Sequence, residues 1–150
     1  MAKPALTDAI QDYLREIYKL GVDGGRVSVT ALAKRQGVSP ASASAMVKKL
    51  AALNLAVHQP YRGITLTTAG EKVALEVIRH HRLLELYLAQ TLGLDVEDVH
   101  DEAERLEHVI SEELEERIDK ALGFPTHDPH GDPIPDEKLR WPQASTRAGG

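Results

Sequence analysis

The most constraining stretch of this sequence is SVTALAKRQGVSPASASAMVKKL, because it holds two helix signals separated by one short turn. Residues 28–36 are expected to form a short helix, and Gly37 suits the position that ends it. Ser39 is a good N-cap and Pro40 suits the first helical turn, so a second helix is expected over residues 40–53. Two helices joined by a short Gly-containing turn predict a helix-turn-helix.

The residues that follow predict a β-hairpin. The stretches LAVHQ and GITLT alternate apolar with polar residues, PYR lies between them, and Gly63 stands at the turn. Upstream, residues 6–20 have apolar residues at helical spacing. A helix, a helix-turn-helix and a hairpin in this order favour a winged helix-turn-helix, in which Val47, Leu50 and Leu53 turn inward. The alternative is an arbitrary helical domain with a hairpin.

The rest of the chain is expected to be mostly helical. A long helix runs from residue 67 to about residue 91, Asp95 caps the next helix, and Ser111 caps another that Gly123 ends. The fold class is therefore mostly α, with a small β-hairpin wing. We expect three segments: a winged helix-turn-helix over residues 1–70, a helical domain over residues 71–124, and a Pro-rich C-terminal tail with little packing over residues 125–150.

The charge is divided along the chain. The formal net charge is −5, yet no acidic residue lies between Asp23 and Glu71. That interval carries +6 from Arg26, Lys34, Arg35, Lys48, Lys49 and Arg62, which leaves −11 for the remaining residues. A basic module joined to an acidic one fits a surface that faces nucleic acid phosphates and a separate surface that binds cations.

Composition excludes several other classes of protein. The chain has no cysteine, which excludes disulfides and thiolate zinc sites, so any metal must take oxygen and nitrogen ligands. It has no run of 18 apolar residues and no secretory signal, so we expect a cytoplasmic protein without a membrane span.

An acidic stretch, DEAERLEHVISEELEERI, contains eight carboxylates and a histidine. Within it, Glu104, Glu107 and His108 stand at positions i, i+3 and i+4, so a helix would present all three on one face. Three potential metal ligands at that spacing favour a site for a divalent cation. The alternative is a solvated acidic face.

The order of these motifs resembles the diphtheria toxin repressor family of metal-dependent regulators. The resemblance rests on HHRLLE, GLDVEDVHDEAERLEHVIS and HGDPIP, and it covers residues 6 to about 135. PYRGITLTTAGE and the helix-turn-helix stretch are more similar to its manganese transport regulator branch. The resemblance implies a DNA-binding homodimer that acts as a metal-activated repressor of metal-uptake genes in metal homeostasis, not an enzyme. Its second domain would carry dimerisation and metal binding.

The resemblance also implies a primary metal site, formed by Asp12, Glu104, Glu107 and His108. Iron regulators have Met and Cys where this sequence has Asp12 and Glu104. Three carboxylates and one imidazole suit Mn(II), a hard ion, and they also accept Fe(II), with Co(II), Zn(II) or Cd(II) as substitutes. The sequence departs from the two-cation manganese site at Arg15, where that branch has a Glu.

A second set of ligands, His81, Glu85 and His100, matches an ancillary site of the iron regulators. In those proteins an SH3-like third domain completes that site, and we expect no such domain in these 150 residues. Simpler interpretations remain open, with Glu104 and Glu107 solvated and His81 merely interfacial. The histidines of the wing and the tail are given no metal role: His58, His127 and His130.

Residues 39–49 are expected to enter the major groove of double-stranded operator DNA, which we expect to be palindromic. Ser39, Ser42 and Ser44 would hydrogen-bond phosphates or bases, and Ala41 and Ala45 would touch thymine methyls. Lys48, Lys49 and Arg62 would contact phosphates, and Arg26, Lys34 and Arg35 are further candidate DNA-binding residues. A palindromic operator has two half-sites, so we expect a two-fold homodimer to bind it. We expect this dimer to be built on residues 69–122. Its candidate interface residues are apolar positions that one small domain cannot all bury, such as Leu84, Leu88, Leu92 and Val109.

Three rival functions are weaker. A di-iron enzyme needs paired Glu-x-x-His motifs, and Arg105 stands three residues before His108. A winged-helix regulator that senses an organic ligand needs an apolar pocket, and it would leave the four primary ligands without a purpose. A structural or interaction module does not explain the basic helix-turn-helix.

Overall fold

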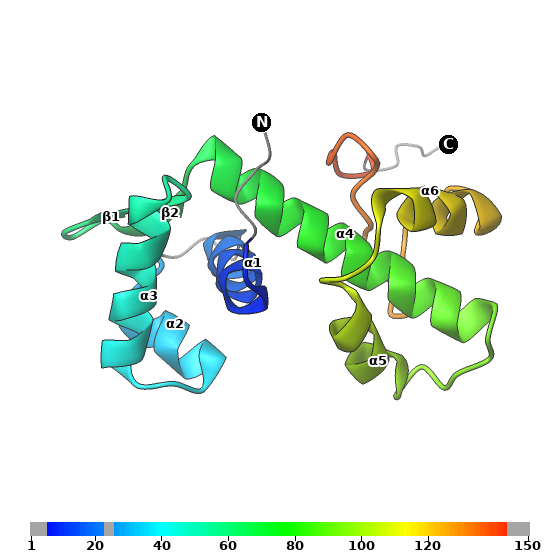
Figure 1. Ribbon diagram of the computed structural model, residues 1–150, viewed down its shortest axis with the longest axis horizontal. Coiled ribbons are helices and arrows are strands. Elements are labelled where there is room, and N and C mark those ends of the chain that lie inside the picture. Colours follow the sequence, from blue (N-terminus) through cyan, green and yellow to red (C-terminus); the bar gives the residue numbers. More distant parts are fainter. Residues whose placement is uncertain (1–5, 23–25, 144–150) are drawn as a thin grey trace. The chain divides into compact units, whose positions relative to one another are not determined.

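The computed structural model describes residues 6–22 and 26–143. The chain forms two compact units, residues 1–75 and residues 76–150. Helix α4 (Thr68–Gln90) runs from the first unit into the second, so the division falls inside a helix (Figure 1). The sequence predicted a domain boundary after residue 70, near the beginning of this helix.

In its described residues, 6–22 and 26–75, the first unit contains three helices and a two-stranded antiparallel sheet, followed by the beginning of α4 (Figure 1). Its elements are α1 (Asp8–Val22), α2 (Val29–Gln36), α3 (Pro40–Ala52), β1 (Ala56–Gln59) and β2 (Gly63–Leu66). This order confirms the predicted winged helix-turn-helix, with α2 and α3 as the helix pair and the two strands as the wing.

Local side-chain chemistry fixes the turn between α2 and α3. Ser28 caps α2 by accepting a hydrogen bond from the N–H of Ala31, and Ser39 caps α3 by accepting one from the N–H of Ser42. Gly37 ends α2 in the left-handed region at φ 67°, which glycine adopts without steric cost. The direction of α3 therefore follows from three residues that the sequence identifies.

The wing is tied to the rest of the first unit at Gly63. The N–H of Ile64 donates to the carbonyl oxygen of Val27 at 2.8 Å. A Cβ on Gly63 would lie 2.5 Å from that same oxygen, and the residue has φ +84°, so only glycine fits. The hydrophobic core beneath includes Leu14, Leu32, Leu50 and Ile64. Leu53, predicted to turn inward, is instead exposed because it lies at the C-cap of α3.

The second unit packs α5 (Val99–Leu106) and α6 (Glu112–Ala121) against α4. Ser111 caps α6 by accepting from the N–H of Leu114, as the sequence predicted. The predicted cap at Asp95 is wrong, because α5 begins only at Val99. The carbonyl oxygen of Asp95 instead accepts hydrogen bonds from the N–H groups of Asp98 and Val99 in a turn.

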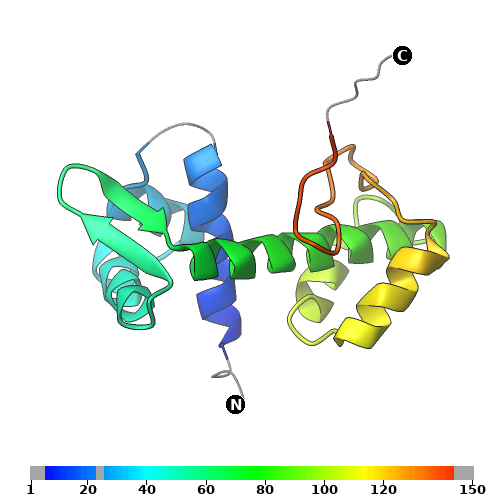
Figure 2. The ribbon, with the colours of Figure 1, turned by 90° about the horizontal axis from the view of Figure 1, so that it is seen from above.

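Residues 126–136 form a strap that packs on α4, so the expectation that the C-terminal tail packs little is wrong for this segment (Figure 2). Arg79 on α4 donates to the carbonyl oxygen of Pro135 at 2.9 Å, and Arg82 donates to that of Pro133 at 2.6 Å. Between them, Ile134 is 1% exposed and joins the core of the second unit. Composition alone gave no sign of this contact.

Two residues of the predicted dimer interface are already buried within the chain. Leu84 and Leu88 are 4% and 6% exposed, so they belong to the interior of the second unit. Leu92 and Val109 are exposed, at 56% and 74%. Of the four predicted interface residues, only these two leave apolar surface for a partner.

Candidate metal centre and DNA-binding surface

Helix α4 and the beginning of α5 bring together the three residues of the second predicted ligand set. His81 Nε2 lies 2.8 Å from Glu85 Oε2, one helical turn further along α4. His100 Nδ1 lies 3.1 Å from the same carboxylate oxygen and 3.1 Å from His81 Nε2. One ligand atom from each residue fits within 4.8 Å of the others, a spacing that suits a divalent cation.

The side chains of this cluster are strongly coupled electrostatically. Burial opposes the protonation of His81, but hydrogen bonds and charges of Glu107 and Glu85 outweigh it and raise the pKa of His81 to about 9. Burial likewise opposes the ionisation of Glu85, but His81, His100 and His130 lower the pKa of Glu85 to about 2. In the metal-free chain, the protonated His81 imidazole therefore balances the negative charge of Glu85 and Glu107. A bound cation would take over this role.

The predicted primary set is only partly gathered in the second unit. Helix α5 ends at Leu106, and Glu107 follows as its C-cap with its carboxylate buried. Oε1 of Glu107 lies 2.5 Å from His81 Nδ1, and Oε2 lies 3.5 Å from His108 Nε2. Glu104 is exposed on α5, with one carboxylate oxygen 3.8 Å from His100 Nε2.

The fourth predicted primary ligand, Asp12, belongs to the first unit. It lies on α1, where Nη2 of Arg15 is 3.5 Å from its Oδ1. Arg15 also donates to Glu16 at 3.0 Å. A guanidinium therefore stands beside Asp12 at the position where the two-cation manganese site would need a carboxylate.

The strap brings in two potential ligands that the sequence did not identify. His130 Nδ1 lies 3.3 Å from Glu85 Oε1, and Asp128 completes a group with these two whose ligand atoms lie within 4.8 Å of one another. Asp128 also accepts hydrogen bonds from the N–H groups of His130 and Asp132, which holds the turn. We expected no metal role for His130, although it begins the motif HGDPIP, because only the packing of the strap reveals Glu85 as its neighbour.

His80, next to His81 on α4, points toward different partners. Its Nε2 lies 2.8 Å from Glu115 Oε1 on α6, and its Nδ1 lies 3.2 Å from the main-chain oxygen of Glu107. Burial opposes its protonation, but the contacts with Glu115 and Glu107 outweigh it and raise the pKa of His80 above its ordinary value. His80 therefore faces α6 and the backbone of Glu107, and it is not part of the cluster of His81, Glu85 and His100.

The predicted DNA contacts all lie in the first unit. Of the predicted contacts on α3 and its N-cap, Ser39, Ala41, Ser42, Lys48 and Lys49 are exposed, and Ser44 is half-buried. Lys34 and Arg35 are exposed at the end of α2, with Arg35 Nε 2.9 Å from Glu16 Oε1. Arg62 lies in the turn of the wing, and Arg26 donates to the carbonyl oxygen of Tyr61 at 2.5 Å.

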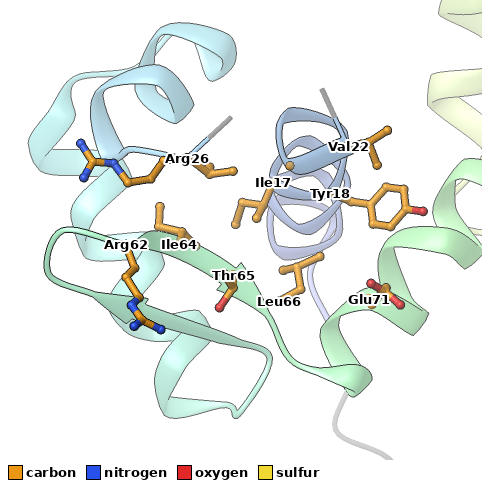
Figure 3. Close-up of a pocket in the computed structure, with 11 residues that line it drawn as sticks. Ile17, Tyr18, Val22, Arg26, Arg62, Ile64, Thr65, Leu66 and Glu71 are labelled. Atoms are coloured by element: carbon orange, nitrogen blue, oxygen red, sulfur yellow. The ribbon is translucent and has the colours of Figure 1, made fainter. Parts of the chain in front are cut away.

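The first unit also has a hollow of about 430 Å³ between α1, the wing and the beginning of α4 (Figure 3). Ile17, Ile64 and Leu66 line its apolar part, and Arg26 and Arg62 line another side. Two of the predicted DNA-binding residues thus border it. The hollow therefore differs from the apolar pocket that a sensor of an organic ligand would need.

Two family descriptions match the two halves of the chain. Residues 5–64 match the N-terminal DNA-binding domain of iron dependent repressors, and residues 67–136 match their metal-binding and dimerisation domain.

Among residues 6–22 and 26–143, no helix is both long enough and apolar enough to cross a membrane.

Individual relatives agree with these matches. The chain is 38% identical over 130 residues to the diphtheria toxin repressor of Corynebacterium diphtheriae, covering 87% of this chain and 58% of the repressor. It is 36% identical over 114 residues to an HTH-type transcriptional regulator of Methanocaldococcus jannaschii, covering 75% of this chain and 91% of the regulator. A solved structure of a manganese-dependent transcriptional repressor in complex with manganese superposes with a TM-score of 0.82 at 46% identity, covering 89% of this chain and 62% of that one. The chain thus spans little more than half the length of the diphtheria toxin repressor that it matches.

Proposed function

The chain belongs to the iron-dependent repressor family, and on that premise we propose that it is a metal-responsive transcriptional repressor without enzymatic activity. The observation that carries the proposal is the cluster of His81, Glu85 and His100, a set of potential metal ligands in one unit of a chain whose other unit is a winged helix-turn-helix. This combination gives the protein a sensor and a DNA reader. It favours metal over an organic compound as the signal.

The proposed primary site consists of Asp12, Glu104, Glu107 and His108, and the proposed second site of His81, Glu85 and His100. Carboxylate oxygens predominate in the primary set, which supports Mn(II) as the activating ion. Fe(II) is the alternative, and Co(II), Zn(II) or Cd(II) would substitute because imidazole and carboxylate ligands accept them. Asp128 and His130 add oxygen and nitrogen donors beside Glu85.

The proposed partner is double-stranded operator DNA, bound by a homodimer. Helix α3 presents small and hydroxyl side chains to the major groove, and Lys48, Lys49 and Arg62 contact phosphates on either side of it. One winged helix reads one half-site, so a two-fold dimer fits a palindromic operator. Exposed Leu92 and Val109 of the second unit supply apolar surface for the dimer.

The proposed switch links the two units through the metal. Asp12 comes from the DNA-binding unit, and Glu104, Glu107 and His108 come from the second unit. Without metal, three carboxylates brought together would repel one another. A bound cation would turn that repulsion into ligation, which would fix the distance between the two α3 helices of the dimer.

DNA binding with a panel of divalent metals at one salt concentration tests this function, because the phosphate contribution depends on salt. We expect Mn(II) or Fe(II) to tighten binding to operator DNA while binding to unrelated DNA changes little. Equal binding with metal and with a chelator would overturn the proposal.

A further inference from the structure

The main-chain oxygen of Glu107 lies just beyond the end of a helix, so no N–H group of that helix donates to it. Helix α5 ends at Leu106, and α6 begins only at Glu112. The N–H of Glu107 still donates to the carbonyl oxygen of Ala103 at 2.8 Å, so Glu107 is the last residue that the helix holds. Carbonyl groups at the end of a helix have no intrahelical donor and need one from elsewhere. His80 on α4 faces this carbonyl, with Nδ1 3.2 Å away.

Both ring nitrogens of His80 meet hydrogen-bond acceptors. The carbonyl oxygen of Glu107 can only accept, and the carboxylate of Glu115, 2.8 Å from Nε2, also accepts. Each ring nitrogen of His80 therefore faces an acceptor to which it can donate, and the ring connects α6 to the turn that follows α5. Its side chain is 17% exposed, so water competes little with these two bonds.

Glu115 is itself held in place from α4. Arg79, 3% exposed, donates to Glu115, to Asp119 at 3.1 Å and to the carbonyl oxygen of Pro135 at 2.9 Å. The acceptor for His80 Nε2 is thus fixed by a buried guanidinium. A chain of contacts leads from Arg79 through Glu115 and His80 to the backbone of Glu107.

We propose that His80 is a positioning residue for the primary metal site, because it anchors the backbone from which Glu107 and His108 project. The inference rests on the proposed function of this site. His80 itself is not a ligand, since both of its nitrogens are engaged elsewhere. Groups that orient metal ligands typically contribute about 10- to 100-fold to metal affinity, so the loss of His80 should cause a measurable loss of metal affinity.

The test is calorimetric titration of the 150-residue chain with Mn(II) in a His100→Ala background, which disables the second site. His80→Leu removes both donors, and we expect Mn(II) affinity to fall roughly tenfold or more. His80→Arg keeps two donors, and we expect it to restore affinity to within about threefold of the background. His127→Leu is the matched control, because it removes another histidine of the same unit that touches neither Glu107 nor Glu115, and it should change nothing.

A double variant separates positioning from general stability. If His80 acts through its bond to Glu115, Glu115→Gln should weaken Mn(II) binding, and adding it to His80→Leu should cost little more than His80→Leu alone. Glu115→Gln also covers the case in which His80→Leu fails to fold, as far-ultraviolet circular dichroism would show. Unchanged affinity in both single variants would overturn the positioning role and leave the proposed function standing. Failure of the background chain to bind Mn(II) would instead overturn the proposed function itself.

Discussion

Oε1 of Glu107 lies 2.5 Å from Nδ1 of His81, so a residue of the proposed primary site touches a residue of the second. The other oxygen of Glu107 faces His108 at 3.5 Å. The second nitrogen of His81 faces Glu85 at 2.8 Å. Glu107 therefore stands between the two proposed sites, and a change in its carboxylate should affect both.

Glu107→Gln should lower Mn(II) affinity at both sites, because it removes a ligand from one and the carboxylate partner of His81 from the other. His100→Ala should act mainly on the second site, since His100 lies 3.1 Å from both Glu85 and His81 but 3.8 Å from Glu104 of the primary set. Calorimetric titration of the two variants and the parent measures this. A Glu107→Gln chain with an unaltered second binding step would show that the two sites are independent.

Arg79→Met should destabilise the second unit by about 3 kcal/mol, because it leaves the carboxylates of Glu115 and Asp119 without their buried partner. Arg117→Met is the matched control. Its ion pair with Glu113 has both side chains 75% exposed, and such pairs contribute less than about 1 kcal/mol. Urea unfolding followed by the fluorescence of Trp141, the single tryptophan, gives both values. Equal losses in the two variants would contradict a buried role for Arg79.

Stability of the metal-free chain should fall as the pH drops below 4.5, in part because of Glu115. Burial opposes the ionisation of Glu115, but His80 and Arg79 outweigh it and hold the pKa of Glu115 below its ordinary value of 4.5. The contribution of ionised Glu115 to the free energy of unfolding is therefore fully present above pH 4.5. It is lost as the pH falls through the lower pKa that Glu115 has in the folded chain. Urea midpoints measured from pH 6 downward should decline less steeply in Glu115→Gln than in the parent. If the urea midpoints of Glu115→Gln and the parent declined in parallel, Glu115 would not contribute to the loss of stability at low pH.

Lys49→Ala and Arg62→Ala should weaken binding to every DNA sequence and reduce the slope of log affinity against log salt by about one unit per lost phosphate contact. Lys49 is exposed on α3 and Arg62 in the turn of the wing. Lys120→Ala, which removes an exposed cation from α6 of the other unit, should leave the slope unchanged. Fluorescence anisotropy at several salt concentrations gives the slopes, and an unchanged slope would remove either residue from the interface.

Local signals predicted the first unit well. Ser28, Gly37 and Ser39 fix the boundaries of α2 and α3 through their own backbone and side-chain chemistry, so the helix-turn-helix could be recognised without tertiary contacts. Asp95 shows the limit of such signals. It is a good capping residue by type, but its carbonyl accepts two bonds in a turn, and α5 starts four residues later.

The second unit depends on contacts between distant segments, which a single sequence does not reveal. The spacing of His81 and Glu85 predicted their common face because both lie on one helix. His130 could not be assigned to Glu85, because a proline-rich segment gives no helical or strand period from which to infer its neighbours. Its place follows from Ile134, which inserts into the core and carries the strap onto α4.

Asp12→Ala tests the proposed switch most directly, because it removes the one primary ligand that lies in the DNA-binding unit. We expect an intact dimer with unchanged non-specific DNA binding, since the residues of α3 and the wing remain. The gain that Mn(II) gives at the operator should be mostly lost, and a coupling of about 1–3 kcal/mol is ordinary for such switches. Asp8→Ala, the same substitution one helical turn earlier on α1, is the control and should keep that gain.

Thermodynamic linkage between metal binding and DNA binding gives the Asp12→Ala test a second measurement. In the parent, operator DNA should tighten Mn(II) binding by the same factor by which Mn(II) tightens DNA binding, because the two equilibria share one coupling free energy. In Asp12→Ala both factors should shrink together toward one, as measured by titrating Mn(II) with and without operator DNA. If Asp12→Ala responds to Mn(II) as the parent does, the metal does not link the two units through α1. The ligands at residues 104–108 would then be structural or incidental to regulation.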